Sequence, residues 1–173
     1  AFGVNRSHGE RKIPGEYDVS CLGYNYRMSE VHAAIGVEQM KKLPDFLSRR
    51  RKNFEALSER LSVLENLSVL PQPVDEKFVS SHYCMGVLLA DSLSPHRPAI
   101  MEGLKQLGIG TSIYYPHPVP HMSYYKERYG KMGCPHAEFI SNSIIALPVA
   151  PHLTEPDMHR IAESFGQVLS GNY

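Results

Sequence analysis

Residues 29–61 read SEVHAAIGVEQMKKLPDFLSRRRKNFEALSERL, and this stretch decides how the rest of the chain can be arranged. Ser29 is a typical N-cap and Glu30 is an acidic residue in the first turn, so a helix is predicted to begin here. Apolar residues then fall around much of the circumference as far as Pro44, which predicts a helix buried on more than one side. From Pro44 to about Leu61, a second and amphipathic helix is predicted.

Beyond this helical region the sequence changes to short mixed elements. Two strands are predicted, in SVLP at 68–71 and in HYCMGVLLA at 82–90. The other predicted elements are a helix from Ser94 that stops at Gly108, a strand at 111–115, short helices at 121–129 and 135–143, a strand in IIALPV at 144–149, and a last helix capped by Thr154. The predicted fold class is therefore α/β, of the α+β kind: a small, mainly antiparallel sheet packed with helices and preceded by a long helical region.

The length of 173 residues fits one domain of ordinary size together with a long connecting segment. Residues 1–27 are rich in Gly, Arg, Asn and Tyr without helical or strand periodicity, so they are predicted to be a lead-in loop. Residues 28–61 are the connecting helices, and residues 62–173 form the small α/β domain. The first residues, AFGVNRSHGERK, read as the middle of a loop, so we expect the chain to be cut from something longer.

Composition excludes several classes of protein. Hydrophobic residues make up 42% and charged residues 21%, which is typical of a globular protein and not of a disordered one. With 18 basic and 18 acidic residues the formal net charge is zero, so neither nucleic acid nor an anionic membrane is an expected partner. Three dispersed cysteines predict no disulfide framework, no apolar run is long enough to span a membrane, and the start is not a signal peptide, so we expect a cytoplasmic protein.

The first candidate site is the run GYNYRM at 23–28, just before the predicted helix. A helix amino end exposes unpaired N–H groups and a partial positive charge, and Arg27 adds a fixed fork of donors, so this run could hold a phosphate. An alternative is structural: Tyr24 and Tyr26 anchor the loop while Arg27 pairs with a carboxylate. The spacing alone leaves both readings open, and favours the structural one.

A second candidate is the run IYYPHPVPHMSYY at 113–125, where prolines stiffen a loop that carries tyrosine and histidine side chains. Such a loop suits the wall of a binding site. His117 and His121 are four residues apart, but the prolines between them exclude a regular helix and no acidic or thiol partner is near, so no metal site is predicted. The basic run RRRK at 49–52 is followed by Glu55 and Glu59, which predicts a solvated, salt-bridged helix face and not an RNA-binding surface.

These runs carry a resemblance to a known family. The stretch LGYNYRMSEVHAAIGVEQMKKLPDFLSRRR at 22–51 closely resembles the signature of the DegT/DnrJ/EryC1/StrS sugar aminotransferases. RSHG at 6–9 is similar to the RNHG of that family, with Ser7 in place of Asn. Further on, GIGTSIYYPHPVPHMSYY and AEFISNSIIALPVAPHLTEPDM also resemble family segments, although VPH here replaces the more usual PLH before His121.

The resemblance implies the carboxy-terminal part of a fold-type-I enzyme that depends on pyridoxal 5'-phosphate (PLP). Such enzymes transfer an amino group from glutamate to a nucleotide-linked keto sugar and act as homodimers. By the same resemblance, Asn25 and Arg27 bind the cofactor phosphate across the dimer, and Tyr24, Tyr115 and His121 bind the sugar nucleotide. The Schiff-base lysine is expected outside this chain, so the chain by itself is expected to be inactive.

Two other functions stay open at this point. Some relatives act as PLP-dependent sugar dehydratases, and the position that decides between the two reactions is not expected in this chain. A non-catalytic structural or dimerisation module is the other possibility. The sequence does not identify the sugar or the nucleotide.

Overall fold

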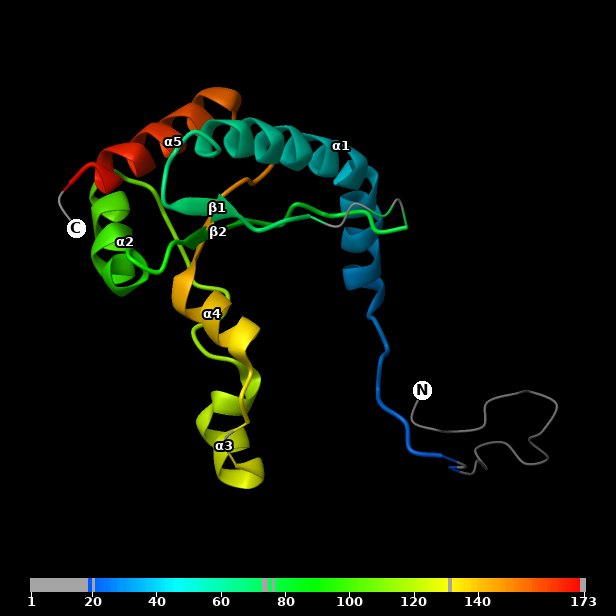
Figure 1. Ribbon diagram of the computed structural model, residues 1–173. Coiled ribbons are helices and arrows are strands. Elements are labelled where there is room, and N and C mark those ends of the chain that lie inside the picture. Colours follow the sequence, from blue (N-terminus) through cyan, green and yellow to red (C-terminus); the bar gives the residue numbers. More distant parts are fainter. Residues whose placement is uncertain (1–18, 20, 73–74, 76, 131, 172–173) are drawn as a thin grey trace, which may run out of the picture. The chain divides into compact units, whose positions relative to one another are not determined.

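The computed structural model describes residues 19, 21–72, 75, 77–130 and 132–171 (Figure 1). Most of the predicted lead-in loop, including RSHG at 6–9, therefore lies outside the described residues. The chain divides into two compact units, Ala1–Leu43 and Pro44–Tyr173. Its elements are α1 (Glu30–Leu61), β1 (Leu67–Val69), β2 (Met85–Leu89), η1 (Ser94–His96), α2 (Arg97–Gln106), η2 (Val119–His121), α3 (Ser123–Tyr129), α4 (Pro135–Ser143), β3 (Ile144–Leu147) and α5 (Glu155–Leu169).

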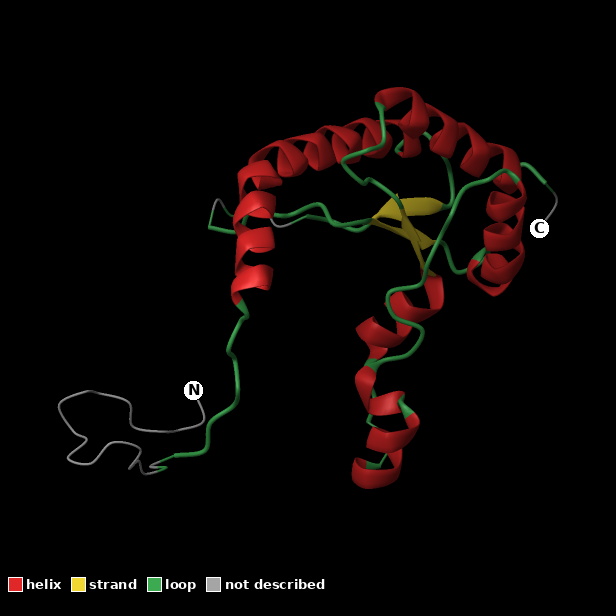
Figure 2. Cartoon of the chain, turned by 180° about the vertical axis from the view of Figure 1, so that it is seen from behind, coloured by secondary structure: helices red, strands yellow, loops and turns green. Residues whose placement is uncertain are grey.

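The sheet of the second unit confirms the predicted fold class. Its three strands lie in the order β1-β2-β3 and both pairs are antiparallel, with Val69 opposite Val87 and Val87 opposite Ile145. Alternate side chains of β2 are fully buried, whereas all four residues of β3 are buried. Helices surround this small sheet, and α5 lies beside the carboxy-terminal part of α1 (Figures 1 and 2).

The core of this unit forms where α1, α2 and α5 meet the sheet. Among its fully buried side chains are Leu57 and Leu61 from α1, Leu104 from α2, and Met158 and Phe165 from α5. The helical spacing of Phe54, Leu57 and Leu61 puts all three on one face of α1, as the amphipathic pattern predicts.

One continuous helix replaces the two predicted around Pro44. Proline has no N–H to donate to the carbonyl four residues earlier, so one hydrogen bond of the helix is absent. Oppositely charged residues three or four apart stabilise the helix on both sides of it: Glu38 with Lys41, and Arg49 with Asp45 at 3.0 Å. The helix begins as predicted, because Ser29 Oγ accepts the backbone N–H of His32 at 3.4 Å.

The prediction that the first part of α1 is buried on more than one side is wrong for this chain by itself. Val31 is 70% exposed and Met40 is 63% exposed, and Ile35 and Val37 are also exposed. These residues belong to the first unit, where the described residues include no sheet that could cover them.

The predicted strand at 111–115 is reduced to a single bridge. Ser112 exchanges two backbone hydrogen bonds with Ala146 of β3, at 3.1 and 2.8 Å. Pro116 and Pro118 follow closely and lack the N–H that a ladder needs, so pairing does not continue. The predicted stop of the preceding helix is confirmed, since Gly108 has a φ of +78°, which favours glycine.

Asn53 fixes α1 to the chain that leaves β3. Its side-chain amide donates to the carbonyl oxygens of Ala150 at 3.0 Å and Leu153 at 3.1 Å. Asn53 is itself buried, one residue before Phe54 on the core-facing side of the helix. A polar side chain in this place satisfies two carbonyls that no strand pairs.

We predict that Asn53→Ala lowers the free energy of unfolding by about 1 to 3 kcal/mol, because two carbonyl groups lose their donor. Urea denaturation followed by circular dichroism measures the change. Asn142→Ala is the matched control, since Asn142 is exposed on α4, and it should change stability little. Equal effects of the two substitutions would contradict the role given to Asn53.

Thr154 and Asp157 define the start of α5. Asp157 Oδ2 accepts the Thr154 hydroxyl at 2.6 Å and the Thr154 backbone N–H at 2.7 Å. These bonds lower the pKa of Asp157 below its ordinary value of 3.8, and the bond from the hydroxyl has the larger effect. A carboxylate in the first turn also interacts favourably with the helix dipole.

Because the folded-state pKa of Asp157 is depressed, its contribution to stability is present above the ordinary carboxyl pKa and is lost as pH falls through the folded value. We predict that Asp157→Asn lowers the urea midpoint at pH 7, and that the difference from the parent chain narrows as pH falls below 3.8. Asp91→Asn, in an exposed turn, is the control. A difference that is independent of pH would show that the charge of Asp157 has no part in stability.

Candidate functional site

The loop before α1 holds three of the predicted site residues close together. Asn25 Oδ1 accepts the backbone N–H of Arg27 at 3.2 Å, which closes a turn and engages the amide oxygen, so the amide nitrogen supplies the donors. The Tyr24 and Tyr26 rings lie 5.7 Å apart, centre to centre. Both tyrosines are exposed.

The electrostatics of this loop suit an anion. The amino end of α1 carries a partial positive charge, and Arg27 adds a full one in the preceding turn. Glu30 opposes them from the first turn of the helix.

The tyrosine-rich loop belongs to the second unit. The Tyr115 ring lies 5.6 Å from the Tyr114 ring, and Tyr114 lies 6.3 Å from Tyr83. A hydrogen bond with Tyr114 raises the pKa of the Tyr83 hydroxyl above its ordinary value, and electrostatic interaction with Tyr114 adds a smaller increase. Tyr115 is 70% exposed, so its ring can contact a ligand.

The surroundings of His121 determine which of its ring nitrogens carries hydrogen. Nε2 lies 2.8 Å from the carbonyl oxygen of Met132 and 3.4 Å from a carboxylate oxygen of Glu138. Both partners are acceptors, so Nε2 is the donor, and Nδ1 of the neutral ring is an acceptor. Glu138 in turn accepts the backbone N–H of Cys134 at 3.0 Å, which holds the start of α4 against His121.

The predicted site residues fall into two groups, one in each unit. Tyr24, Asn25 and Arg27 belong to Ala1–Leu43, and Tyr115 and His121 to Pro44–Tyr173. Each group is locally ordered by its own contacts. His117 is exposed, and no cluster of three metal-ligating side chains occurs in the part of the chain that the structure describes.

One residue close to the tyrosine-rich loop, Arg50, is not among the site residues predicted from the sequence. The prediction of a solvated face for RRRK holds for Arg49 and Arg51, which pair with Asp45 and Glu55 on exposed surface. Arg50 differs, since its guanidinium lies 6.0 Å from the centre of the Tyr83 ring and its Nε is buried. The signal was present in the spacing, because Arg50 precedes Asn53 and Phe54 by three and four residues and so shares their face of the helix.

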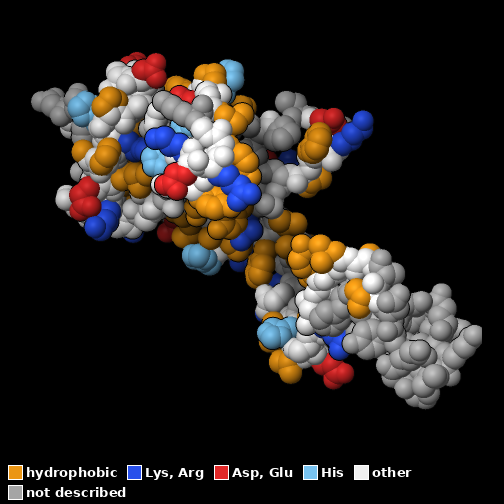
Figure 3. Space-filling view, turned by 90° about the horizontal axis from the view of Figure 1, so that it is seen from below, with side chains coloured by type: hydrophobic (Ala, Val, Ile, Leu, Met, Phe, Trp, Pro, Cys, Tyr) orange, Lys and Arg blue, Asp and Glu red, His pale blue; other side chains and the backbone are white. Residues whose placement is uncertain are grey.

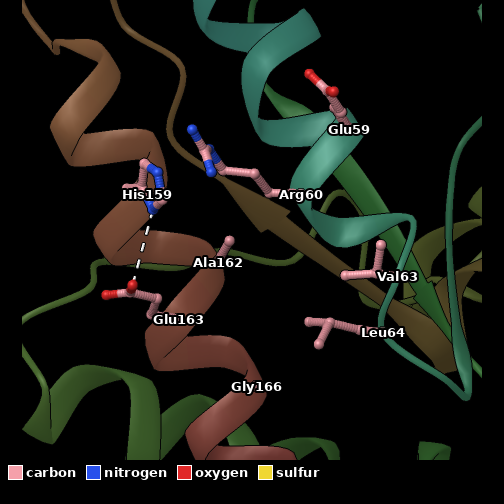
Figure 4. Close-up of a pocket in the computed structure, with 8 residues that line it drawn as sticks. All are labelled: Glu59, Arg60, Val63, Leu64, His159, Ala162, Glu163 and Gly166. Atoms are coloured by element: carbon pink, nitrogen blue, oxygen red, sulfur yellow. Dashed lines mark ion pairs between the residues drawn. The ribbon is translucent and has the colours of Figure 1, made fainter.

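A further hollow, of about 450 Å³, lies between the carboxy-terminal end of α1 and α5, with Val63, Leu64, Ala162 and Gly166 along it (Figure 4). Charged side chains of both signs border it, and His159 lies 3.7 Å from Glu163. On the face shown in Figure 3, basic and acidic side chains both occur among apolar ones, in keeping with the neutral net charge.

Comparison with known proteins identifies the kind of chain that has this arrangement. The model of the DegT/DnrJ/EryC1/StrS aminotransferase family matches residues 2–166. An uncharacterised protein of Methanocaldococcus jannaschii is 30% identical over 160 residues, which cover 90% of this chain and 40% of that protein.

Solved structures of aminotransferases have the same fold. PseC of Helicobacter pylori, an aminotransferase involved in the biosynthesis of pseudoaminic acid, superposes with a TM-score of 0.84 at 22% identity, over 99% of this chain and 44% of PseC. The aminotransferase TlmJ of Streptoalloteichus hindustanus superposes with a TM-score of 0.76 at 27% identity, over 90% of this chain and 40% of TlmJ. The chain thus spans about two fifths of the length of these relatives.

The contact between His121 and α4 gives a local prediction. Glu138→Ala should speed hydrogen exchange at the Cys134 amide by about ten- to hundredfold, because this N–H loses a bond to a charged acceptor. Exchange measured by NMR at single residues reports it. Glu127→Ala, on the exposed surface of α3, serves as the control and should leave the Cys134 amide unchanged. Unaltered exchange in Glu138→Ala would show that Glu138 does not order this segment.

Proposed function

Because the chain belongs to the DegT/DnrJ/EryC1/StrS aminotransferase family, we propose that it forms part of an enzyme that transfers an amino group from glutamate to a nucleotide-linked keto sugar. The family match over residues 2–166 is the observation that carries this proposal. The structural relationship to sugar aminotransferases supports it, among them CalS13 of Micromonospora echinospora. Glutamate as the amino donor and the nucleotide-linked keto sugar as the acceptor are part of the proposal. We also propose that the parent protein acts as a homodimer in the cytoplasm.

The family is PLP-dependent, and the loop before α1 fits the phosphate of that cofactor. The amide nitrogen of Asn25 and the guanidinium of Arg27 are donors that follow one another at the amino end of a helix, where an anion is favoured. Glu30 reduces the positive field but does not remove these donors. When bound, PLP supplies the electron sink for the reaction of an amine with a carbonyl.

In this proposal the residues of the chain bind and orient. Asn25 donates to the cofactor phosphate of the partner subunit, and Arg27 supplies the positive charge beside it. Tyr24 and Tyr115 offer exposed rings and hydroxyls to the sugar nucleotide. The hydrogen on Nε2 of His121 is engaged by Met132, so Nδ1 is available to accept a hydrogen bond from a sugar hydroxyl.

The lysine that holds the cofactor belongs, in this proposal, to the part of the protein outside this chain. The chain alone is then inactive. A PLP-dependent sugar dehydratase is the alternative within the family. The two reactions differ in product, because an aminotransferase yields an amino sugar, whereas a dehydratase removes water from the sugar and leaves no new amino group on it.

In the full-length protein we predict that Asn25→Ala weakens PLP binding by about 1 to 3 kcal/mol, the cost of losing a hydrogen bond to a charged group, without a loss of stability. Arg27→Lys distinguishes a bidentate role of Arg27 from a point-charge role, since lysine keeps the charge but loses the planar fork. A bidentate role predicts a clear loss of PLP affinity, and a point-charge role predicts little change. A fluorescence titration of the apoenzyme with PLP measures both. Gln106→Ala, in an exposed position on α2, is the control.

Mixed dimers test whether the loop acts across the subunit interface. At a PLP concentration too low to saturate the Asn25→Ala homodimer, an Asn25→Ala subunit combined with a subunit that lacks the cofactor-binding lysine should restore about one competent site per heterodimer. Activity that stays absent in folded heterodimers would exclude action in trans. An amino sugar formed with consumption of glutamate supports the proposed reaction. A dehydrated sugar without a new amino group would show that the protein is a dehydratase instead.

A further inference from the structure

A cavity of about 310 Å³ lies beside the tyrosine-rich loop, wholly within the unit Pro44–Tyr173. The residues that line it include Arg50, Tyr83, Cys84, Ser112 and Tyr114, together with residues 146–150. A cavity of this size is sufficient for a small ligand. The residue types that line it decide what kind of ligand it can hold.

The cavity is electropositive. Among the described residues that line it, Arg50 is the one with a full charge at neutral pH. Burial raises the pKa of the Cys84 thiol, so this group stays neutral and does not offset the guanidinium. The hydroxyl of Tyr83 also stays neutral, because its pKa is raised by the hydrogen bond with Tyr114.

The fold gives Arg50 little freedom to leave the cavity. It lies one turn before Asn53, whose two hydrogen bonds fix α1 to Ala150 and Leu153. Its guanidinium is held over the Tyr83 ring at 6.0 Å, the outer range of a cation–π contact. The neighbouring arginines, 49 and 51, are on other faces of the helix and pair with Asp45 and Glu55.

The buried Nε of Arg50 has no hydrogen-bond acceptor among the described residues. A charged donor that is shielded from water and left unpaired is costly, and such groups call for an explanation in terms of a partner. Because Nε is shielded, the two terminal nitrogens of the guanidinium are the donors that a ligand can reach, and they match two oxygens of one anion. The hydroxyl groups of Ser112 and Tyr114 in the same wall are additional donors.

We propose that this cavity binds the oxyanion of a small ligand, a carboxylate or a phosphoryl group, with Arg50 as its main donor and Ser112 and Tyr114 as secondary donors. The residues that line the cavity all belong to the unit Pro44–Tyr173, whereas Asn25 and Arg27 of the proposed cofactor-phosphate site belong to Ala1–Leu43. The inference does not depend on the proposed reaction. It adds a second anion-binding function to this chain.

The test follows the Arg50 side chain directly. The Nε–Hε resonances of the arginines are recorded by NMR on the 173-residue chain, and Arg50 is assigned by its absence in Arg50→Lys. Sodium glutarate, inorganic phosphate and sodium chloride are titrated separately at constant ionic strength. A saturable shift with glutarate alone identifies a carboxylate site, one with phosphate alone a phosphoryl site, and one with both a general oxyanion site.

Variants establish which residue carries the binding. Arg50→Gln should weaken the oxyanion by about ten- to hundredfold, as expected for loss of a charged donor. Binding in these variants is followed at the backbone amides of Ser112 and Tyr114. Arg49→Gln, the matched control on an exposed face, should bind as the parent does. Tyr114→Phe removes a secondary donor and keeps the ring, so it should weaken binding less than Arg50→Gln.

Three results would overturn the proposal. The first is an Arg50 chemical shift that does not saturate with glutarate or phosphate and resembles the shift in chloride. The second is an equal loss of oxyanion affinity in Arg49→Gln and Arg50→Gln. The third is an unchanged oxyanion affinity in Arg50→Gln. Circular dichroism of each variant confirms folding. Should Arg50→Gln fail to fold, Arg50→Lys together with Tyr114→Phe decides the question, since loss of the planar fork and loss of a donor must each weaken a true site.

Discussion

The contact on which the rest of this structure depends is the packing of one face of α1 against the three-stranded sheet. Phe54, Leu57 and Leu61 bury most of that face, and α5 completes the core with Met158 and Phe165. Burial of each large apolar side chain contributes about 1.5 to 3 kcal/mol, so this helix–sheet contact (the seam) stabilises the fold more than the exposed ion pairs along the same helix do. Asn53 then fixes the register of the seam through two backbone carbonyls.

That seam also fixes where polar groups can lie. A helix that is apolar at 54, 57 and 61 must carry residue 50 on the same side, at the point where the hydrophobic core ends. An arginine there is half-buried, with its charged guanidinium near the Tyr83 ring. The same logic places the tyrosine-rich loop, because the two bonds between Ser112 and Ala146 tie that loop to β3.

The sequence predicted most elements because their signals are local. Thr154, Gly108 and Ser29 mark helix ends through chemistry that depends on immediate neighbours. It failed at Pro44, where a single missing hydrogen bond did not end a helix supported on both sides, and at 111–115, where prolines cut a strand short. The contacts of His121 with Met132 and Glu138 join residues 11 and 17 positions apart on either side of α3, which no periodicity encodes. Arg50 was hidden by a charge run in which each arginine faces a different way. The predicted roles of Tyr24, Asn25, Arg27, Tyr115 and His121 remain predictions.

A sheet this small would ordinarily be a template for association with other chains, since each outer strand presents unpaired backbone groups. Here both borders are short. On one side, β1 has only three residues. On the other side, Ser112 pairs with the backbone N–H and C=O of Ala146, and Pro116 and Pro118 prevent the loop from becoming a longer strand. A foreign strand that tried to extend the sheet would find few consecutive donors and acceptors. The prolines of the tyrosine-rich loop therefore also limit the length of strand pairing that a second chain could add at this edge.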